Sequence, residues 1–590
     1  MLVLTALLAA LLTGCGLPLT DGVQSAGEVS RENAEPVGIQ VLPPGPQPGA
    51  TAVDLVRGFL RAQSSPDDAH AVARQFLAPG VEWDDEDVVV VYAPGSQIVR
   101  VDPDDPERVE VRLKVTARIA PDGAYRLEPA DTPPPPDEFR VGAGQDGRLL
   151  LTEVPTGLRL ASADVPRSYA PQDVFMFGDV PAVPAGTDPA AMGDERLVPD
   201  RVFLPVTVDP ASALVRALLR GPSLSLAPAV RTAVPEGTTL TSPVVTQDGV
   251  VTVDLSEQTL GLDEAGRRRL AAQVVWTLQD YTGVRLLSGG RPLDVGRGGQ
   301  VQTRDDWSEF DPAGTVREAP LYYVQGRKLV GLDASLPAGE ATRPGPLQVD
   351  AAAVNPATGR LAVLTRDPTG EDQIRIGPVR GVMGGPVFAR PELGSLSWGS
   401  GERGLWLLER AVGDAPARVW LLPLPAEGKP VAPQEVLVEM PVGAGPLTQV
   451  TASRDGARVA LVFGQDESRQ LYVGRVQPAG GGGRIADVVP VAPGLSNVTD
   501  VAWETGTSLV VLASDSSAAG LLTLTVAVDG SSAVPLQRQG VEGVAQSVAA
   551  APGRPLVVAA AQEGQATQLF VDDGVLLRPQ AAGAEPFYPG

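Results

Sequence analysis

The chain contains one cysteine, Cys15, and one histidine, His70, among its 590 residues. Thiol and imidazole groups commonly serve as nucleophiles, general bases and zinc ligands. With one of each, an intramolecular disulfide cannot form and a zinc site of several Cys and His ligands is excluded. Any Ser-His-Asp triad would have to use His70. The chemistry of the sequence therefore depends first on where these two residues lie.

His70 falls in a predicted helix whose apolar stripe comprises Val72, Ala73, Phe76 and Leu77. The imidazole lies off that stripe. The sequence offers no second His to join it as a ligand, and the only Cys is near the N-terminus. We interpret His70 as an ordinary, partly exposed helix residue.

Cys15 follows an apolar run, Leu2 to Leu12, that is too short to span a bilayer and has the length of a signal-peptide core. The segment Leu12-Thr13-Gly14-Cys15 matches a lipobox, the motif at which signal peptidase cleaves before the cysteine. We predict cleavage between Gly14 and Cys15, a diacylglyceryl thioether on the Cys15 sulfur and an N-acyl (palmitate) chain on its amine. Residues 1–14 are then a lipoprotein signal peptide. They contain no Lys or Arg, which leaves the true translation start open.

Residues 15–49 are polar and rich in Pro and Gly, a composition typical of a flexible tether. No later stretch is long and apolar enough to span a membrane. Acyl chains contribute about 0.8 kcal/mol per buried methylene, so two or three of them anchor a protein firmly. We predict a lipid-anchored protein on the extracytoplasmic face of the cell membrane.

The net charge of −24 argues against nucleic acid as a partner, because phosphate binding needs a concentrated positive field. Hydrophobic residues make up 43% of the chain, which is enough to bury several cores. The 66 Gly and 57 Pro residues indicate many strands joined by turns.

Residues 50–165 show two amphipathic helices followed by strands, so we predict a small α+β domain. The segment Gly142 to Gly147 matches G-x-G-x-x-G, but a strand follows it where a dinucleotide site needs a helix. We therefore interpret it as a hairpin loop. Two acidic clusters, at 84–87 and 102–107, lack EF-hand spacing and are interpreted as solvated loops rather than a calcium site.

Residues 170–300 alternate strands with two helices that begin at Asp209 and Asp263. Three motifs, at 215–222, 250–256 and 273–278, resemble the GerMN domain in order and spacing. That resemblance implies an α+β fold with no known catalytic residues. Trp276 lies on the second helix and is interpreted as a core residue.

Residues 315–590 repeat a unit of short apolar strands. Equivalent positions recur at intervals of about 44 to 55 residues, the period of a propeller blade; they are Val354, Trp398, Ser453, Trp503 and Ala551. We predict an all-β propeller of five or six blades. The strands near 321–332 either form a further partial blade or close the ring against the last one.

The order of these parts, a lipobox, a small α+β domain, a GerMN domain and a C-terminal propeller, resembles the LpqB lipoproteins of actinobacteria over the whole chain. The resemblance implies an accessory partner of a two-component system, which associates with the extracellular domain of a sensor histidine kinase similar to MtrB. It also implies a role in cell-envelope and division homeostasis. The surface that contacts the kinase and the signal transmitted are not indicated by the sequence.

Two other functions remain open from the residues alone. One is a module that binds a cell-wall polymer without contacting a kinase. The other is a propeller hydrolase, of which a glycosidase with paired carboxylates is the form that the residues leave open. Ser-x-x-Lys and P-loop motifs are excluded, because no lysine has Ser three positions before it or Ser or Thr directly after it. We predict a protein that is not an enzyme, with no catalytic residue, cofactor or metal site.

Overall fold

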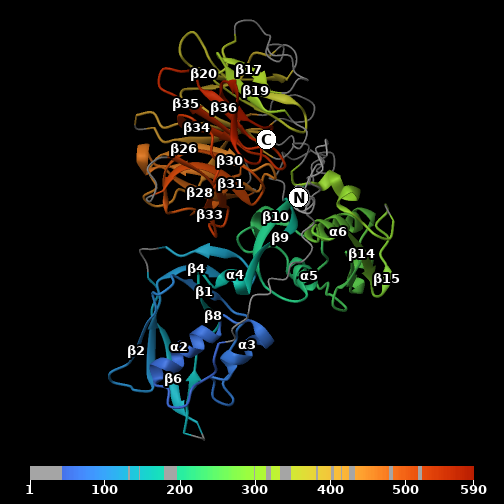
Figure 1. Cartoon of the computed structure of the whole chain (residues 1–590). Helices are drawn as coiled ribbons and strands as arrows, with labels where there is room; N and C mark the ends of the chain where they lie inside the picture. The colour runs from blue at the N-terminus through green and yellow to red at the C-terminus, as the bar shows by residue number, and fades with distance from the viewer. Residues whose placement is uncertain are drawn as a thin grey trace, which may run out of the picture. The chain divides into compact units, whose positions relative to one another are not determined.

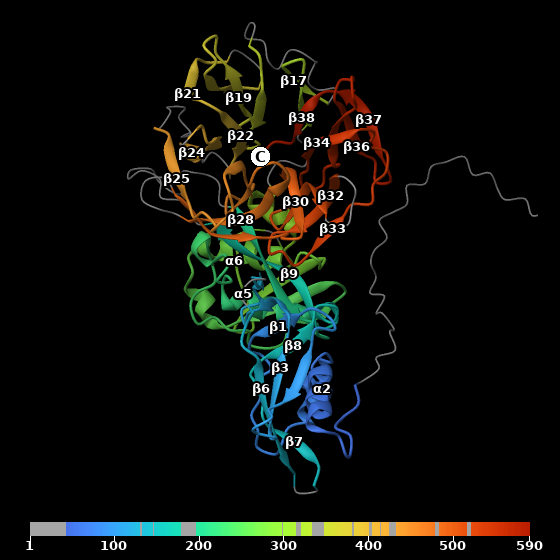
Figure 2. The ribbon, with the colours of Figure 1, turned by 90° about the vertical axis from the view of Figure 1, so that its left-hand side faces the viewer.

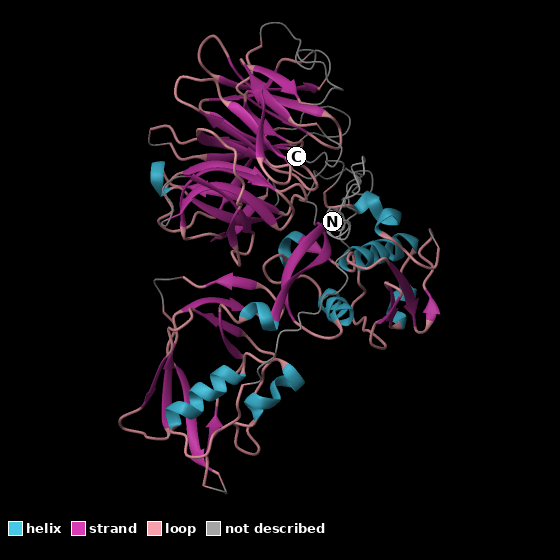
Figure 3. Ribbon diagram, viewed as in Figure 1, coloured by secondary structure: helices cyan, strands magenta, loops and turns pink. Residues whose placement is uncertain are grey.

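The computed structural model describes residues 43–590 apart from 130–132, 145–146, 179–195, 298, 314–319, 333–346, 380–382, 400–403, 414, 424–431, 478–482 and 516–520. Gly14 and Cys15, with the rest of the predicted signal peptide and most of the tether, lie outside the described residues. Within the described part, no helix is both long and apolar enough to cross a membrane. Helices are concentrated in the first half of the chain, and the second half is built almost wholly of strands (Figure 3).

The first region is α+β, as predicted, and its described residues form three helices, the last of them short, and two four-stranded sheets. One sheet has the order β5-β4-β1-β8 and the other β2-β3-β6-β7. Its helices are α2 (Ala52–Ala62) and α3 (Asp67–Arg74), with a short α4 (Val165–Ser168) after the last strand. Its strands are β1 (Val89–Tyr92), β2 (Ile98–Val101), β3 (Arg108–Arg112), β4 (Val115–Ile119), β5 (Tyr125–Leu127), β6 (Asp137–Ala143), β7 (Leu149–Glu153) and β8 (Leu158–Ala161).

Helix α2 begins at a capping box in which Thr51 and Asp54 exchange side-chain and backbone hydrogen bonds. Its apolar face buries Leu55 and Phe59 in the core between the helix and the sheets. The G-x-G-x-x-G segment joins β6 to β7, which pair in antiparallel fashion. It is therefore a hairpin connection, as the following strand indicated. His70 lies in α3, and its ring is 5.9 Å from that of Trp83.

The second region contains a β-α-β unit in which α6 connects two parallel strands, β13 and β14. Both predicted helix starts are confirmed, because Asp209 accepts from the Ser212 backbone N–H and Asp263 from that of Gly266. Trp276 is buried, and its Nε1 donates to the Trp307 carbonyl at 3.2 Å. The helices are α5 (Pro210–Arg220), α6 (Glu264–Thr277) and the 3₁₀ segments η2 (Ala227–Ala229), η3 (Glu257–Gly261) and η4 (Arg304–Phe310). The strands are β9 (Tyr169–Gly178), β10 (Leu197–Pro205), β11 (Val230–Arg231), β12 (Val245–Gln247), β13 (Val250–Leu255), β14 (Gly283–Ser288) and β15 (Arg291–Pro292).

The third region is a β-propeller of six blades. Of the two blade numbers predicted from the sequence, five and six, the structure therefore shows six. Figure 1 draws this region in yellow-green to red, and Figure 2 shows its strands arranged in a ring, with β22, β30, β34 and β38 nearer the middle than β21, β25 and β37. The innermost strands are β18 (Ala351–Val354), β22 (Leu393–Trp398), β26 (Leu447–Ala452), β30 (Leu495–Trp503), β34 (Val544–Ala549) and β38 (Ala584–Phe587).

Outside the innermost strands, the remaining strands complete each blade in chain order. They are β16 (Tyr322–Gln325), β17 (Lys328–Gly331), β19 (Arg360–Arg366), β20 (Asp372–Pro378), β21 (Pro386–Arg390), β23 (Leu405–Glu409), β24 (Arg418–Leu422), β25 (Gln434–Val438), β27 (Arg458–Phe463), β28 (Gln470–Gln477), β29 (Arg484–Pro490), β31 (Ser508–Asp515), β32 (Leu521–Ala527), β33 (Ala533–Pro535), β35 (Val557–Ala561), β36 (Gln568–Asp572) and β37 (Leu577–Ala582). A short parallel pairing of β25 with β29 joins two neighbouring blades at their outer edges.

The sixth blade combines strands from the two ends of the propeller sequence. Its order is β17-β16-β38, so the last strand of the chain is innermost and pairs with β16. Gln325 Nε2 donates to the Ala582 carbonyl at 2.8 Å across 257 residues of sequence. The two ends of the propeller sequence thus hold the ring closed, and the strands near 321–332 belong to this closing blade.

Candidate functional site

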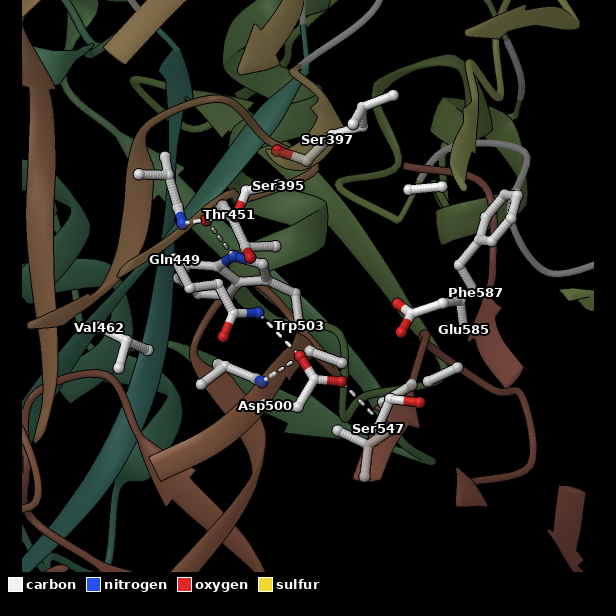
Figure 4. Close-up of a pocket in the computed structure, with 18 of the residues that line it drawn as sticks. Ser395, Ser397, Gln449, Thr451, Val462, Asp500, Trp503, Ser547, Glu585 and Phe587 are labelled. Atoms are coloured by element: carbon white, nitrogen blue, oxygen red, sulfur yellow. Dashed lines mark hydrogen bonds between the residues drawn. The ribbon is translucent and has the colours of Figure 1, made fainter. Parts of the chain in front are cut away.

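The six innermost strands enclose a central channel with a cavity of about 340 Å³ (Figure 4). Its wall combines small apolar residues with polar and charged ones, and five of the strands place polar side chains on it. These wall residues include Ser395 and Ser397 from β22, Gln449 from β26, Asp500 from β30, Ser547 from β34 and Glu585 from β38. The channel therefore combines shape with a defined set of hydrogen-bonding groups.

Register shifts place the polar residues on the channel wall. Strands β22, β26, β30 and β34 each pair irregularly with the next strand of their own blade. The regular pairing resumes at Ser397, Gln449, Asp500 and Ser547 respectively. A bulge redirects side chains relative to the pleat. Each of these four blades has a polar side chain on the cavity wall directly after its register shift.

Left-handed backbone accompanies these irregular segments at three non-glycine residues. Ser395, Asn497 and Glu585 have φ angles of 50°, 47° and 50°, in β22, β30 and β38 respectively. Such a conformation costs of the order of 1–3 kcal/mol in a residue with a Cβ, and it persists where the surrounding structure enforces it. Three of the ten left-handed non-glycine residues in the described structure thus lie on strands that line the channel.

Side chains of the channel wall link four successive blades, from the blade of β22 to the blade of β34. Ser397 Oγ accepts from the Ala452 backbone N–H at 3.0 Å, linking β22 to β26. Gln449 Nε2 donates to Asp500 at 2.8 Å, linking β26 to β30. The other oxygen of Asp500 accepts from the Val548 backbone N–H at 2.8 Å, linking β30 to β34. We call this series of bonds the inter-blade belt.

Two tryptophans at the ends of inner strands add to the belt. Trp398 Nε1 donates to the Ala353 carbonyl at 3.1 Å, which links β22 to β18. Trp503 Nε1 donates to the Thr451 carbonyl at 2.9 Å, which links β30 to β26. Both indoles are buried, and an indole N–H buried in this way needs such an acceptor.

Asp500 accepts three hydrogen bonds and so links three strands of the inter-blade belt. Besides the bonds to Gln449 and Val548, it accepts from the Val501 backbone N–H at 2.9 Å. Burial raises the pKa of Asp500 to about 6, against the opposing effect of these three hydrogen bonds. None of the three donors carries a charge. No ion pair to Asp500 occurs among the residues that the structure describes.

Among the described residues, no side-chain hydrogen bond of this kind links β34 to the next inner strand, β38. Ser547 is 5% exposed, and its Oγ has no hydrogen-bond partner in the described structure. A buried hydroxyl in this state forfeits about 1–3 kcal/mol relative to one that is hydrogen-bonded. Like Ser397 and Asp500 in their own strands, Ser547 is the residue at which regular pairing resumes after a register shift.

Glu585 faces this junction from β38. Burial raises the pKa of Glu585 to about 7, and the nearby Asp500 carboxylate raises it further, whereas Arg410 opposes both effects. The Glu585 side chain is enclosed by protein yet open to the cavity, since much of its surface is accessible there. Neither a hydrogen bond nor an ion pair holds its carboxylate within the described residues.

Arg454 fixes one end of the channel. Its guanidinium donates to the carbonyls of Trp503 at 2.7 Å, Ala550 at 3.0 Å and Pro589 at 3.2 Å, which lie at or just beyond the ends of β30, β34 and β38. Burial lowers the pKa of Arg454 to about 10. Because its nitrogens are committed to three carbonyls, Arg454 braces the ring.

Both Asp500 oxygens are held by the belt, which leaves neither free to attack a substrate. The propeller sequence contains no His or Cys to serve as an alternative base or nucleophile. The channel instead offers acceptors, of which Glu585 and Ser547 have no partner within the described structure.

Sequence reasoning identified Gly14 and Cys15 as site residues, and both lie outside the described residues. It did not identify the channel residues. A signal for them exists, because Asp500 and Glu585 are the two charged residues within the six innermost strands. Finding it would have required the inner strand of each blade to be known.

A closed six-bladed ring that follows two α+β regions defines a multidomain protein with a C-terminal propeller. Family models match along the chain in that order: the N-terminal domain of lipoprotein LpqB at residues 45–166, a sporulation and spore germination domain (Germane) at 185–294 and the LpqB β-propeller domain at 334–585.

A relative named lipoprotein LpqB from Thermobifida fusca is 30% identical, over 99% of this chain and 98% of its own length. One with the same name from Streptomyces coelicolor is 27% identical over 98% of this chain and 96% of its own length. The chain belongs to the LpqB lipoprotein family.

Two solved structures are similar to parts of the chain at low identity. TolB from Acinetobacter baumannii is 14% identical and covers 48% of this chain and 69% of its own, with a TM-score of 0.36. The tandem GerMN domains of GerM from Bacillus subtilis are 19% identical and cover 23% of this chain and 45% of theirs, with a TM-score of 0.18.

Proposed function

We propose that this chain is an accessory protein of a two-component system, lipid-anchored at Cys15 on the extracytoplasmic face of the cell membrane. In this proposal it binds the extracellular domain of a sensor histidine kinase similar to MtrB. Through the kinase it influences cell-envelope and division homeostasis. The kinase partnership is what the resemblance to LpqB lipoproteins implies.

The observation that carries the binding role is the channel itself. Its one fully hydrogen-bonded carboxylate, Asp500, ties three blades together, and its remaining acceptors line a cavity without a nucleophile and base in contact. A rigid ring of this kind is suited to presenting fixed surfaces and groups to a partner. Relatives that match nearly the whole chain are named lipoproteins, which agrees with a role other than catalysis.

The kinase partnership is tested with the full-length lipidated protein in detergent and the immobilised extracellular domain of the kinase. We expect saturable binding to that domain and none to the kinase's cytoplasmic part, which serves as the control. Absence of saturable binding, together with retention on purified wall polymer, would favour the wall-binding alternative. Release of sugar or peptide fragments from that polymer would instead establish a hydrolase.

The lipid anchor is tested separately, by fractionating cells that express Cys15→Ala. This variant should leave the membrane fraction, because no thiol remains to carry the diacylglyceryl group. Thr13→Ser is the matched control, since it keeps a small residue in the lipobox and should stay membrane-bound. Retention of Cys15→Ala in the membrane fraction would contradict the anchor.

A further inference from the structure

We propose that a second cavity, where the first region, the second region and the propeller meet, binds a neutral and mainly apolar small molecule. The molecule would carry one oxygen that accepts a hydrogen bond from the hydroxyl of Tyr125. The cavity has a volume of about 340 Å³, which suits a small-molecule ligand, and it shares no lining residue with the propeller channel. This site goes beyond the kinase partnership and does not depend on it.

Direct contacts hold the walls of this junction cavity in place within the compact unit Pro43–Gly590. Arg458 Nη2 donates to the Pro199 carbonyl at 2.9 Å, which joins the propeller to the second region. The Phe203 N–H donates to the Gly123 carbonyl at 2.8 Å, which joins the second region to the first. Small-molecule sites occur preferentially at such junctions between domains, because several fixed surfaces converge there.

Apolar side chains from all three regions provide most of the junction cavity's surface. Leu127 comes from β5 of the first region, and Leu226 directly precedes η2 of the second. Val473 and Val489 come from the propeller strands β28 and β29. Val489 is 39% exposed although it lies beside these apolar neighbours. A ligand with an apolar body would cover this surface and remove it from water.

The charges on the cavity wall balance, and their pairing favours a neutral ligand. Asp487 pairs with Arg126 at 3.0 Å and with Arg475 at 3.5 Å. Asp529 pairs with Arg201 at 3.2 Å. The four basic and four acidic side chains that line the cavity are Arg126, Arg201, Arg458, Arg475, Glu128, Asp200, Asp487 and Asp529.

The other three charged side chains of the wall also have partners. Glu128 accepts from Arg118 Nε at 3.0 Å. Both oxygens of Asp200 accept hydrogen bonds from Ser223, at 2.6 Å and 2.8 Å. Arg458 is held by its bond to the Pro199 carbonyl. An ionic ligand would therefore lose its hydration without gaining a free counter-charge, which is costly.

The Tyr125 hydroxyl is the polar group that the wall offers to such a ligand. Tyr125 lines the cavity and keeps part of its surface accessible, and its ring lies 5.0 Å from that of Phe203. Its Oη makes no hydrogen bond to any residue that the structure describes. Burial, with the Asp529 carboxylate, raises the pKa of Tyr125 to about 12, so the hydroxyl stays protonated and can donate. An acceptor oxygen on the ligand would supply the partner that an enclosed tyrosine hydroxyl usually has.

The proposal is tested with fluorescent probes and the full-length chain carrying Cys15→Ala, which needs no detergent that would take up apolar probes. Prodan is a neutral naphthalene ketone. Phenyl-naphthylamine is neutral but lacks a carbonyl, and anilinonaphthalene sulfonate adds a negative charge to that same skeleton. We expect prodan to bind saturably, at one site per chain and at least tenfold more tightly than the sulfonate. A sulfonate that binds as tightly as prodan, or prodan binding that does not saturate, would overturn the proposal.

Displacement of prodan distinguishes two sources of this ligand chemistry. Methyl decanoate presents a flexible chain and acetylnaphthalene a flat ring, and each carries one carbonyl group. Stronger displacement by methyl decanoate would indicate a lipid-derived ligand, and stronger displacement by acetylnaphthalene a soluble aromatic one. Displacement by neither would contradict the site.

A matched pair of valine variants locates the bound probe. Val489→Trp should weaken prodan binding at least tenfold, because the larger side chain occupies the cavity from a partly exposed position. Val534→Trp is the control, since Val534 is also an exposed valine on an outer propeller strand, β33, and lies outside the cavity wall. Equal effects of the two substitutions would overturn the proposal.

A second pair tests the hydrogen bond from Tyr125. Tyr125→Phe should weaken prodan severalfold and leave phenyl-naphthylamine unchanged, because only prodan carries the carbonyl acceptor. Tyr281→Phe removes a hydroxyl outside the cavity wall and should change neither probe. Prodan should also raise the melting temperature of the unsubstituted cavity, since a ligand that binds only the folded chain stabilises it. Unchanged prodan affinity in Tyr125→Phe would contradict the role of the hydroxyl, and a lowered melting temperature would contradict the site.

Discussion

The two arcs of the propeller's inner ring differ in how their polar groups are used. From β22 through β26 and β30 to β34, side chains of one blade bond to the next, and Asp500 alone accepts three hydrogen bonds. From β34 to β38, Ser547 and Glu585 face the cavity without such bonds within the described structure. The comparison teaches that polar side chains of the inner strands can hold the ring together in one arc and remain without a bond in another.

The largest expected difference between the arcs is in the two carboxylates. Asp500→Ala should lower the free energy of unfolding of the propeller by about 3 kcal/mol, because it leaves three donors without their acceptor. Glu585→Ala removes no hydrogen bond and should change it far less. Urea unfolding followed by tryptophan fluorescence measures both. Similar losses for the two variants would break the distinction between the arcs.

A smaller difference is expected between two serines. Ser397→Ala should lower the free energy of unfolding by about 1–2 kcal/mol, since the buried Ala452 N–H loses its acceptor. Ser547→Ala removes a hydroxyl that has no partner and should be neutral or slightly stabilising. The same unfolding assay applies. A destabilised Ser547→Ala would indicate that its hydroxyl has a structural partner.

The smallest expected effect is on the dependence of stability on pH. Folding raises the pKa of Asp500 to about 6 and that of Glu585 to about 7, so the folded protein holds protons that the unfolded chain releases. The stabilisation from these protons is fully present below the unfolded values near 4 and is lost as pH rises through about 6 to 7. Glu585→Gln should therefore show a shallower fall in melting temperature between pH 5 and pH 8. An unchanged slope would contradict the raised pKa of Glu585.

Much of the propeller could be predicted because its repeats are local. Val354, Trp398 and Trp503, aligned from the sequence, each end an inner strand. The blade count stayed open because the sixth blade draws β16, β17 and β38 from opposite ends of the repeat region. A repeat in the sequence does not reveal that strands from opposite ends of the repeat region pair with each other.

The channel site was not predicted, for a different physical reason. Alternation of side chains along a strand assigns faces only while the register is regular. The register shifts before Gln449, Asp500 and Ser547 change which residues face the cavity. The polar residues that line the channel therefore carry no period that sequence reasoning could follow.

The closing strand has a consequence for folding kinetics. Glu585 reaches the channel only when β38 pairs with β16, a contact whose loop-closure entropy is high because nearly the whole propeller sequence lies between the two strands. Each blade before it can form from neighbours in sequence. An open ring would have its blades but would lack this carboxylate in its channel.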